Sequence, residues 1–391
     1  MSDHRVSLAC VLCMFLIVPT WAQPPPPPPP DFAPLQYYDF EQDTAPWVSM
    51  NPQAIVGLTA AQDDVLEGTS SLEVKYLFGA TKTGMEGMLS GSAILPLAGG
   101  IPGMASMTLG FKSSEAITAV VGVRERGGGA YMAPFFSPGK VWQRVVLGLD
   151  DFYPVDDMVD PDGILEPEQL EGLGILDASS FLATMVAKLP VAGFEPGARQ
   201  MYLDEVKLLQ VKWDPEVAPR PEGTPRGVVI DMCDRPGIRW IVLGGQDWKA
   251  TREADDPTGR AAGTWYYRFE YTLPGGTLVA WLKPVRLGQL AETTALHLSV
   301  RADRQLPLVV SVEEKGKGRY SQQIEALAGD QWAKLDLAWD GFTLEKDSKD
   351  EDGKLDPDQI TSVTIADPSG LAGRPEDQKT VLWLDNVYAT K

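Results

Sequence analysis

Cysteine and histidine are scarce in this chain of 391 residues, which holds three cysteines and two histidines. Cys10 and Cys13 lie in an apolar N-terminal segment, so Cys233 is the one thiol beyond it. A single thiol cannot form an intrachain disulfide. With so few thiols and imidazoles, the sequence offers no His/Cys metal cluster and no convincing nucleophile–base pair, and it lacks a G-x-S-x-G motif. We therefore predict a protein that is not an enzyme.

Basic residues are also few relative to acidic ones. Lys and Arg total 34 against 54 Asp and Glu, which gives a formal net charge of −20. Such a surface repels phosphate backbones, so we predict no nucleic-acid partner. The excess carboxylates can bind hard cations. Paired carboxylates also catalyse glycoside hydrolysis, so a glycosidase stays a formal alternative.

A long apolar run occurs only near the N-terminus, where VSLACVLCMFLIVP follows MSDHR and precedes Thr20, Trp21 and Ala22. This pattern predicts a signal peptide over residues 1–22 and a secreted or periplasmic protein. The run is too short for a comfortable membrane span, so we expect no membrane insertion after cleavage; an uncleaved anchor is the alternative. Residues 23–36, with prolines from Pro24 to Pro30, predict a stiff spacer, or a ligand for a proline-reading domain.

No long stretch carries the 3.6-residue period of an amphipathic helix, and the one helix-like segment is EPEQLEGL at 166–173. Glycine (38) and proline (32) are abundant between short alternating segments. These segments read as strands of antiparallel sheets with one face in a core. They include residues 71–78, 107–112, 117–126, 141–149, 200–209, 296–302, 308–316 and 381–387.

The chain repeats itself. Residues 142–170 and 332–360 align without a gap and agree at 11 of 29 positions, where composition alone gives roughly two. The segments around them match in the same order, so the repeat covers whole domains. We predict an all-β protein of two tandem antiparallel β-sandwich (jelly-roll) domains, at 37–213 and 228–391, joined by a proline-rich linker at 214–227.

The first copy carries four motifs in the order DFE…W, GTSSLEVKY, W…DF…DG-x-L-x-P-x-Q and YLDEV, and the second copy carries degenerate counterparts in the same order. In this order they resemble carbohydrate-binding modules of the galactose-binding-like jelly-roll type, and also the domains of complex I intermediate-associated proteins. The resemblance covers nearly all of the chain after the prolines, because each of the two copies shows it. It implies a polysaccharide or glycan partner, although such domains also occur as scaffolds without a sugar site.

The same resemblance implies a structural Ca²⁺ held by acids of the first and last strands. The matching residues are Asp39, Glu41 and Asp204, with Asp63 or Asp64, in the first domain, and Asp231 and Asp385, with Asp255 or Asp256, in the second. Cys233 aligns with Glu41, and a thiol is a poor calcium ligand, so the second site is the weaker prediction. The alternative is that these are solvated acids at strand ends.

The loops at 160–169 and 350–359 contain D-x-D-G, the centre of an EF-hand loop. However, Met158 and Ser348 stand at the first ligand position and Gln169 and Gln359 at the twelfth, where an EF-hand needs acids. We predict turns at Gly163 and Gly353 instead, each followed by one helical turn before the next strand.

Candidate sugar-binding residues come from aromatic and polar side chains. Trp47, Trp240, Trp142 and Trp332 recur in place and predict packing, whereas Trp248, expected in a loop, is the best platform candidate. A polar sheet face is expected on residues 117–126 and on the strand that follows them, and again on the equivalent strands of the second copy. Such a face could form a sugar-binding groove. The alternative is that these sheet faces are simply solvated. The candidate ligand-binding residues are Arg124, Arg126, Tyr131, Trp248, His297 and Tyr320.

The sequence thus predicts a secreted, non-catalytic carbohydrate-binding protein. A structural or protein-binding envelope component without a sugar site is the first alternative. A glycan-active enzyme is the weaker one.

Overall fold

The computed structural model describes residues 33–79, 87, 89–155, 158, 160, 163–186, 189–211, 227–254, 265–326, 331–350, 352–373 and 378–391. The predicted signal peptide, Pro24 to Pro30 of the spacer and residues 214–226 of the linker lie outside them. Within these ranges, no helix is long and apolar enough to cross a membrane.

The first sandwich consists of two antiparallel sheets. Sheet A has the order β2 (Ile55–Thr59), β3 (Ser71–Phe78), β11 (Gly197–Leu209), β5 (Ser106–Ser113) and β8 (Gln143–Gly148), with β1 (Gln36–Tyr38) paired to β11. Sheet B has the order β4 (Ser92–Pro96), β10 (Leu170–Asp177), β6 (Ile117–Glu125), β7 (Ala130–Ser137) and β9 (Tyr153–Pro154). Buried residues of both sheets form one core between them.

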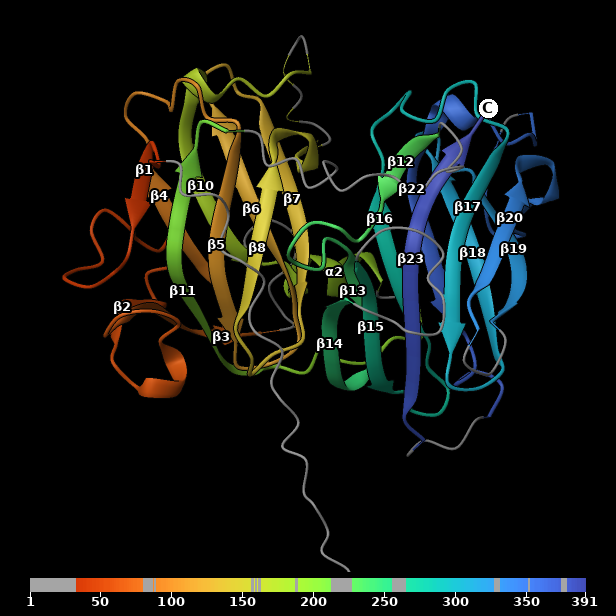
Figure 1. The fold of residues 1–391 in the computed structure, drawn as a ribbon, viewed down its shortest axis with the longest axis horizontal. Helices are drawn as coiled ribbons and strands as arrows, with labels where there is room; N and C mark the ends of the chain where they lie inside the picture. The colour runs from red at the N-terminus through yellow and green to blue at the C-terminus, as the bar shows by residue number, and fades with distance from the viewer. Residues whose placement is uncertain are drawn as a thin grey trace, which may run out of the picture. The chain divides into compact units, whose positions relative to one another are not determined.

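The second sandwich repeats this plan (Figure 1). Sheet C has the order β14 (Gln246–Ala254), β15 (Trp265–Thr272), β23 (Thr380–Thr390), β17 (Ala295–Ala302) and β20 (Ala333–Ala338), with β12 (Val228–Asp231) paired to β23. Sheet D has the order β13 (Ile241–Leu243), β16 (Val279–Pro284), β22 (Ile360–Asp367), β18 (Leu306–Glu314), β19 (Arg319–Ala326) and β21 (Thr343–Leu344).

The predicted fold class is confirmed, because each sandwich is built from antiparallel sheets whose inward residues alternate with outward ones. In β3, for example, Leu72, Val74 and Tyr76 are buried while Lys75 and Leu77 are exposed. The segment at 166–173 is a correction: only Pro167–Gln169 form a 3₁₀ turn (η3), and β10 begins at Leu170. The sequence did not predict α2 (Ser179–Met185).

The two sandwiches contact each other through the outer faces of sheets B and D. Val120 and Met132 of sheet B belong to a small apolar cluster with Leu182 of α2 and with Leu243 and Ala280 of sheet D. Main-chain atoms also meet, since the N–H of Phe136 donates to the carbonyl of Ile238 at 2.7 Å. Parts of both outer sheet faces are therefore used for packing between the sandwiches.

Candidate functional site

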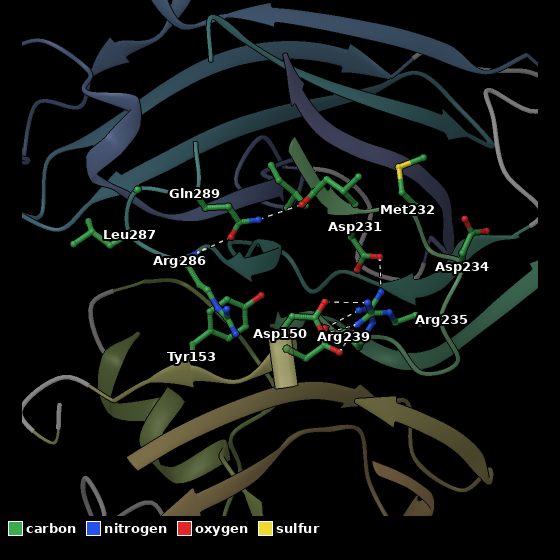
Figure 2. Close-up of a pocket in the computed structure, with 14 residues that line it drawn as sticks. Asp150, Tyr153, Asp231, Met232, Asp234, Arg235, Arg239, Arg286, Leu287 and Gln289 are labelled. Carbon is green, nitrogen blue, oxygen red and sulfur yellow. Dashed lines mark hydrogen bonds and ion pairs between the residues drawn. The ribbon is translucent and has the colours of Figure 1, made fainter. Parts of the chain in front are cut away.

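A pocket of 520 Å³ opens where the sandwiches meet (Figure 2). The first sandwich contributes the 3₁₀ turn η2 (Leu149–Asp151) and Tyr153 of β9. The second contributes β12, the segment that follows it as far as Arg239, and residues 286–289 between β16 and β17. Its volume lies in the range of small-ligand sites.

Paired charges form the inner wall of this pocket. Asp151 accepts hydrogen bonds from Arg239 at 2.7 Å and from Arg235 at 2.9 Å. Burial alone would raise the pKa of Asp151, but Arg239, Arg235 and Lys283 outweigh burial and hold this pKa at about 2. Asp151 is 6% exposed, so these ion pairs are largely shielded from solvent.

A second carboxylate extends the charge network into the core of the second sandwich. Asp231, which is 1% exposed, accepts from Arg239 at 3.0 Å and from the indole N–H of Trp240 at 3.0 Å. The ammonium group of Lys283 lies 3.7 Å from the same carboxylate. Burial alone would raise the pKa of Asp231, yet the two cations lower it. The inner wall is therefore ionised and fixed in position.

The outer wall is more exposed. The Nη2 atom of Arg286 donates to the carbonyls of Leu149 at 2.9 Å and Phe152 at 3.2 Å. Gln289 holds this segment in place, because its Oε1 atom accepts from the main-chain N–H of Arg286 and its amide donates to the carbonyl of Val229. Figure 2 shows Arg286 extending beside the ring of Tyr153. An aromatic ring beside fixed donors and acceptors is an arrangement that can bind a polyhydroxylated ligand.

The structure corrects two of the predicted ligand-binding residues. Tyr131 and Tyr320 are each 2% exposed and belong to the two sandwich cores. Tyr131 lies opposite Val123 in the sheet register, and Tyr320 lies opposite Val312. Because opposite residues point to the same face, both tyrosine rings point inward and cannot contact a glycan.

The predicted residues Arg124, Arg126 and His297 are at the surface but not together. Arg124 lies on β6 in the first sandwich and Arg126 directly follows this strand, where its Nη2 atom donates to the carbonyl of Glu168 at 2.8 Å. His297 lies on β17 in the second sandwich. Its two ring nitrogens are 2.6 Å from oxygens of Asp336 and Thr390, so both are already engaged.

Trp248 is half-buried and lies on strand β14, where a loop was expected. Its ring packs against Phe136 of the first sandwich, with 5.1 Å between centroids, and against Tyr271 at 5.2 Å. It lines a second pocket of 440 Å³. Aromatic neighbours on several sides make Trp248 a packing residue between the sandwiches as well as a pocket wall.

The acids predicted to hold calcium in the first sandwich bind protein groups. Glu41 accepts from the main-chain N–H of Thr69 at 2.9 Å and from its hydroxyl at 2.6 Å. Asp204, fully buried, accepts from the N–H groups of Leu66 at 3.0 Å and Glu67 at 3.1 Å. Asp39 accepts from the N–H of Glu41. Among the described residues, no three of the predicted acids bring their carboxylates together, so main-chain carbonyls would have to complete a calcium site here.

In the second sandwich, the carboxylate of Asp231 forms ion pairs with Arg239 and Lys283. Asp385 accepts from the main-chain N–H of Asn386 at 2.7 Å and from its side-chain amide at 2.9 Å. Asp255 and Asp256 lie outside the described residues. Calcium binding stays a prediction for both sandwiches.

The structure also corrects the alignment of Cys233 with Glu41. Cys233 has a φ of 57° and is fully buried, and Phe40 has a φ of 56° and is 3% exposed. Each lies seven residues before a buried tryptophan, Trp240 or Trp47. Cys233 therefore occupies the place of Phe40, and Asp234, which lines the pocket, occupies that of Glu41.

The acidic loops are turns, as predicted. Gly163 and Gly353 have φ values of 67° and 69°, and the 3₁₀ turns η3 and η6 (Pro357–Gln359) follow. Beside the first loop, the carboxylates of Glu125, Asp160 and Glu166 lie close together, and desolvation raises the pKa of Glu125. The main-chain N–H of Glu166 donates to Glu125, so this acid helps to fix the turn.

Sequence reasoning missed the residues that build the pocket: Asp150, Asp151, Tyr153, Arg235, Arg239 and Arg286. One signal was available. In the aligned repeat, Asp151 stands opposite Gly341, so a buried carboxylate occurs in one copy alone. The partners of Asp151 lie more than 80 residues away, and no local pattern indicates them.

No family model matches the sequence, and no curated protein matches it significantly. Solved structures do match. A family 11 carbohydrate-binding module from Clostridium thermocellum, solved with a beta-1,3-1,4-mixed-linked tetrasaccharide, is 12% identical, with 39% of this chain and 88% of that chain covered and a TM-score of 0.30. The tandem of two family 22 modules from Paenibacillus barcinonensis is 15% identical, with 92% and 97% covered and a TM-score of 0.27.

An exo-beta-agarase is 9% identical, with 38% of this chain and 23% of that chain covered and a TM-score of 0.29. The matches include modules of the kind that the sequence resembles. At TM-scores of 0.30 and below, they carry no argument about what this chain binds.

Proposed function

We propose that this protein binds carbohydrate in the pocket between its two sandwiches. The observation that carries the proposal is the composition of that pocket. Ionised side chains from both sandwiches are held there by buried ion pairs, beside the half-buried ring of Tyr153. Fixed donors and acceptors match the hydroxyl groups of a sugar, and an aromatic ring packs against its apolar face.

Because both sandwiches build the wall, the site is single. Asp150 and Tyr153 come from the first sandwich, whereas Arg235 and Arg286 come from the second. We therefore expect one glycan per chain rather than two equivalent sites that act through avidity. Secretion, supported by the N-terminal pattern, and a non-catalytic role, supported by the scarcity of thiols and imidazoles, are parts of the same proposal.

A structural or envelope role without a glycan is the second candidate. The contact between the outer faces of sheets B and D favours it, because apolar residues such as Val120 and Leu243 occupy surface there that a ligand would otherwise contact. The two candidates differ in whether the pocket binds a glycan.

The test is a glycan array probed with the full chain, followed by calorimetric titration of the oligosaccharides it retains. Tyr153→Ala removes the aromatic wall and should weaken binding up to about 10-fold, since an aromatic contact contributes about 0.5–1.5 kcal/mol. Tyr388→Ala is the matched control, because this half-buried tyrosine stacks on His297 on sheet C, outside the pocket. Retention of no glycan by the folded wild-type chain would refute the proposal and favour the structural role.

A further inference from the structure

We infer that the glycan bound in this pocket carries a carboxylate, as a uronic acid does, and that Arg286 is the residue that recognises it. The inference rests on the proposed function and adds the chemical class of the ligand. The three arginines that line the pocket differ in their partners.

Two of these arginines are neutralised by the protein itself. Arg235 pairs with Asp150 at 3.0 Å and with Asp151 at 2.9 Å. Arg239 pairs with Asp151 at 2.7 Å and with Asp231 at 3.0 Å. The positive charges of these arginines offset the negative charges of the carboxylates, so the inner wall does not repel an anion.

Arg286 differs because its contacts are with main-chain carbonyls. Its Nη2 atom donates to Leu149 and Phe152, and among the described residues no carboxylate lies within ion-pair distance of its guanidinium group. The Nε atom and the Nη1 group are thus left to a ligand. The two carbonyl contacts hold the guanidinium in place, so little side-chain entropy is lost on binding.

A carboxylate satisfies these donors better than a hydroxyl does. A hydrogen bond between two charged groups is roughly twice as strong as one between neutral groups, and the partly enclosed pocket reduces screening by water. Arg286 is exposed, so the anion reaches it from solvent. An anionic ligand suits this pocket even though the whole chain is acidic, because distant charges are screened beyond about 8 Å in physiological salt.

The pocket also orients such a sugar. Figure 2 shows Arg286, beside the ring of Tyr153, on one side of the pocket and Asp234 on the other. A uronic acid with its carboxylate at Arg286 would place its ring against Tyr153 and its hydroxyl groups toward Asp150 and Asp234. A carboxylate accepts hydrogen bonds from sugar hydroxyls, so this end of the pocket suits the polar edge of the ring.

The experiment titrates the full chain with tetrasaccharides of galacturonic, mannuronic and guluronic acid, and with their carboxyl-reduced, neutral counterparts. At least one acidic tetrasaccharide should bind about 10-fold to 100-fold more tightly than its neutral counterpart, with affinity falling as salt rises. Arg286→Gln should abolish that preference, because it lowers the affinity for the acidic form by more than it lowers the affinity for the neutral form. Arg286→Lys should keep part of the preference.

Arg304→Gln is the matched control, since this half-buried arginine pairs with Asp303 outside the pocket. Melting temperatures establish that each variant is folded. Equal or tighter binding of the neutral tetrasaccharides overturns the inference and leaves the proposed function standing. A preference for acidic sugars that survives in Arg286→Gln also overturns it. Binding of no acidic or neutral glycan overturns both.

Discussion

At the scale of single residues, burial acts on carboxylates in two opposite ways. Asp151 and Asp231 are buried beside cations, which lower the pKa of each. Asp204 is buried with N–H groups as its nearest partners. Desolvation outweighs those hydrogen bonds and raises the pKa of Asp204 to about 6. Partners of full charge offset desolvation, whereas neutral donors do so only in part.

The first prediction concerns protonation of Asp204. A solvated aspartate has a pKa near 3.9, so the folded value of about 6 lies above the unfolded one. Between these two values the folded state binds more protons, and this group makes the free energy of unfolding rise as the pH falls from about 6 to about 4. The carboxyl carbon of Asp204, followed by NMR, should titrate near pH 6.

The control is Asp204→Asn, which should remove this part of the pH dependence of unfolding. Asp151 acts in a separate window. Its folded pKa of about 2 lies below the unfolded value, so the stability it contributes is present above about pH 4 and is lost as the pH falls toward 2. A midpoint near 4 for Asp204 would show that desolvation at this position is small.

At the scale of elements, the duplicated acidic turn follows from its glycines. Gly163 and Gly353 have positive φ values, and a Cβ atom at either position would meet nothing within 4 Å. A side chain there would therefore suffer backbone strain without a clash. The same turn at the same place in both copies shows that backbone conformation is what the repeated motif encodes.

We predict that Gly163→Ala and Gly353→Ala each lower the free energy of unfolding by about 1 kcal/mol. In a domain of this size the melting temperature should fall by about 2–4 °C, measured by scanning calorimetry. Gly57→Ala is the control, since Gly57 is open to solvent on the side of a Cβ and has no positive φ. An equal loss of stability in this control and in the two turn variants would show that positive φ is not the cause.

The elements show what the sequence can reveal. Strands such as β5 and β18 were predicted to within about two residues, because alternation of buried and exposed positions is a local signal. The seven-residue helix α2 is too short to show a helical period. Tyr131 and Tyr320 were assigned to the wrong face because their register with Val123 and Val312 is a property of the paired strands.

At the scale of the whole molecule, the buried ion pairs connect the two sandwiches. Asp151 belongs to the first sandwich, and both of its arginine partners belong to the second. The sequence shows two copies of one domain, but the hydrogen bond from the N–H of Val242 to the hydroxyl of Thr118 joins sheets B and D across 124 positions. The hydrophobic periodicity of a strand does not indicate which distant residues it contacts. The fold was therefore predictable from the sequence, whereas the pocket was not.

The third prediction removes the shared carboxylate. Asp151→Ala leaves Arg239 and Arg235 without their common partner in a buried place, at a cost of about 3–5 kcal/mol. Denaturant unfolding should therefore shift to lower concentration. The control is Asp340→Ala, an exposed acid that aligns with Asp150 in the other copy, which should change stability by no more than about 0.5 kcal/mol. Equal effects would show that the ion pairs contribute little to stability.

The most direct test of the binding site is hydrogen–deuterium exchange of the full chain, with and without a saturating amount of the oligosaccharide that the array shows to bind most tightly. The account predicts slower exchange in three segments that line the pocket: 149–154, 229–239 and 286–289. Protection should appear in both sandwiches at once. Protection confined to one sandwich, or to sheet faces away from these segments, would contradict a site built by both.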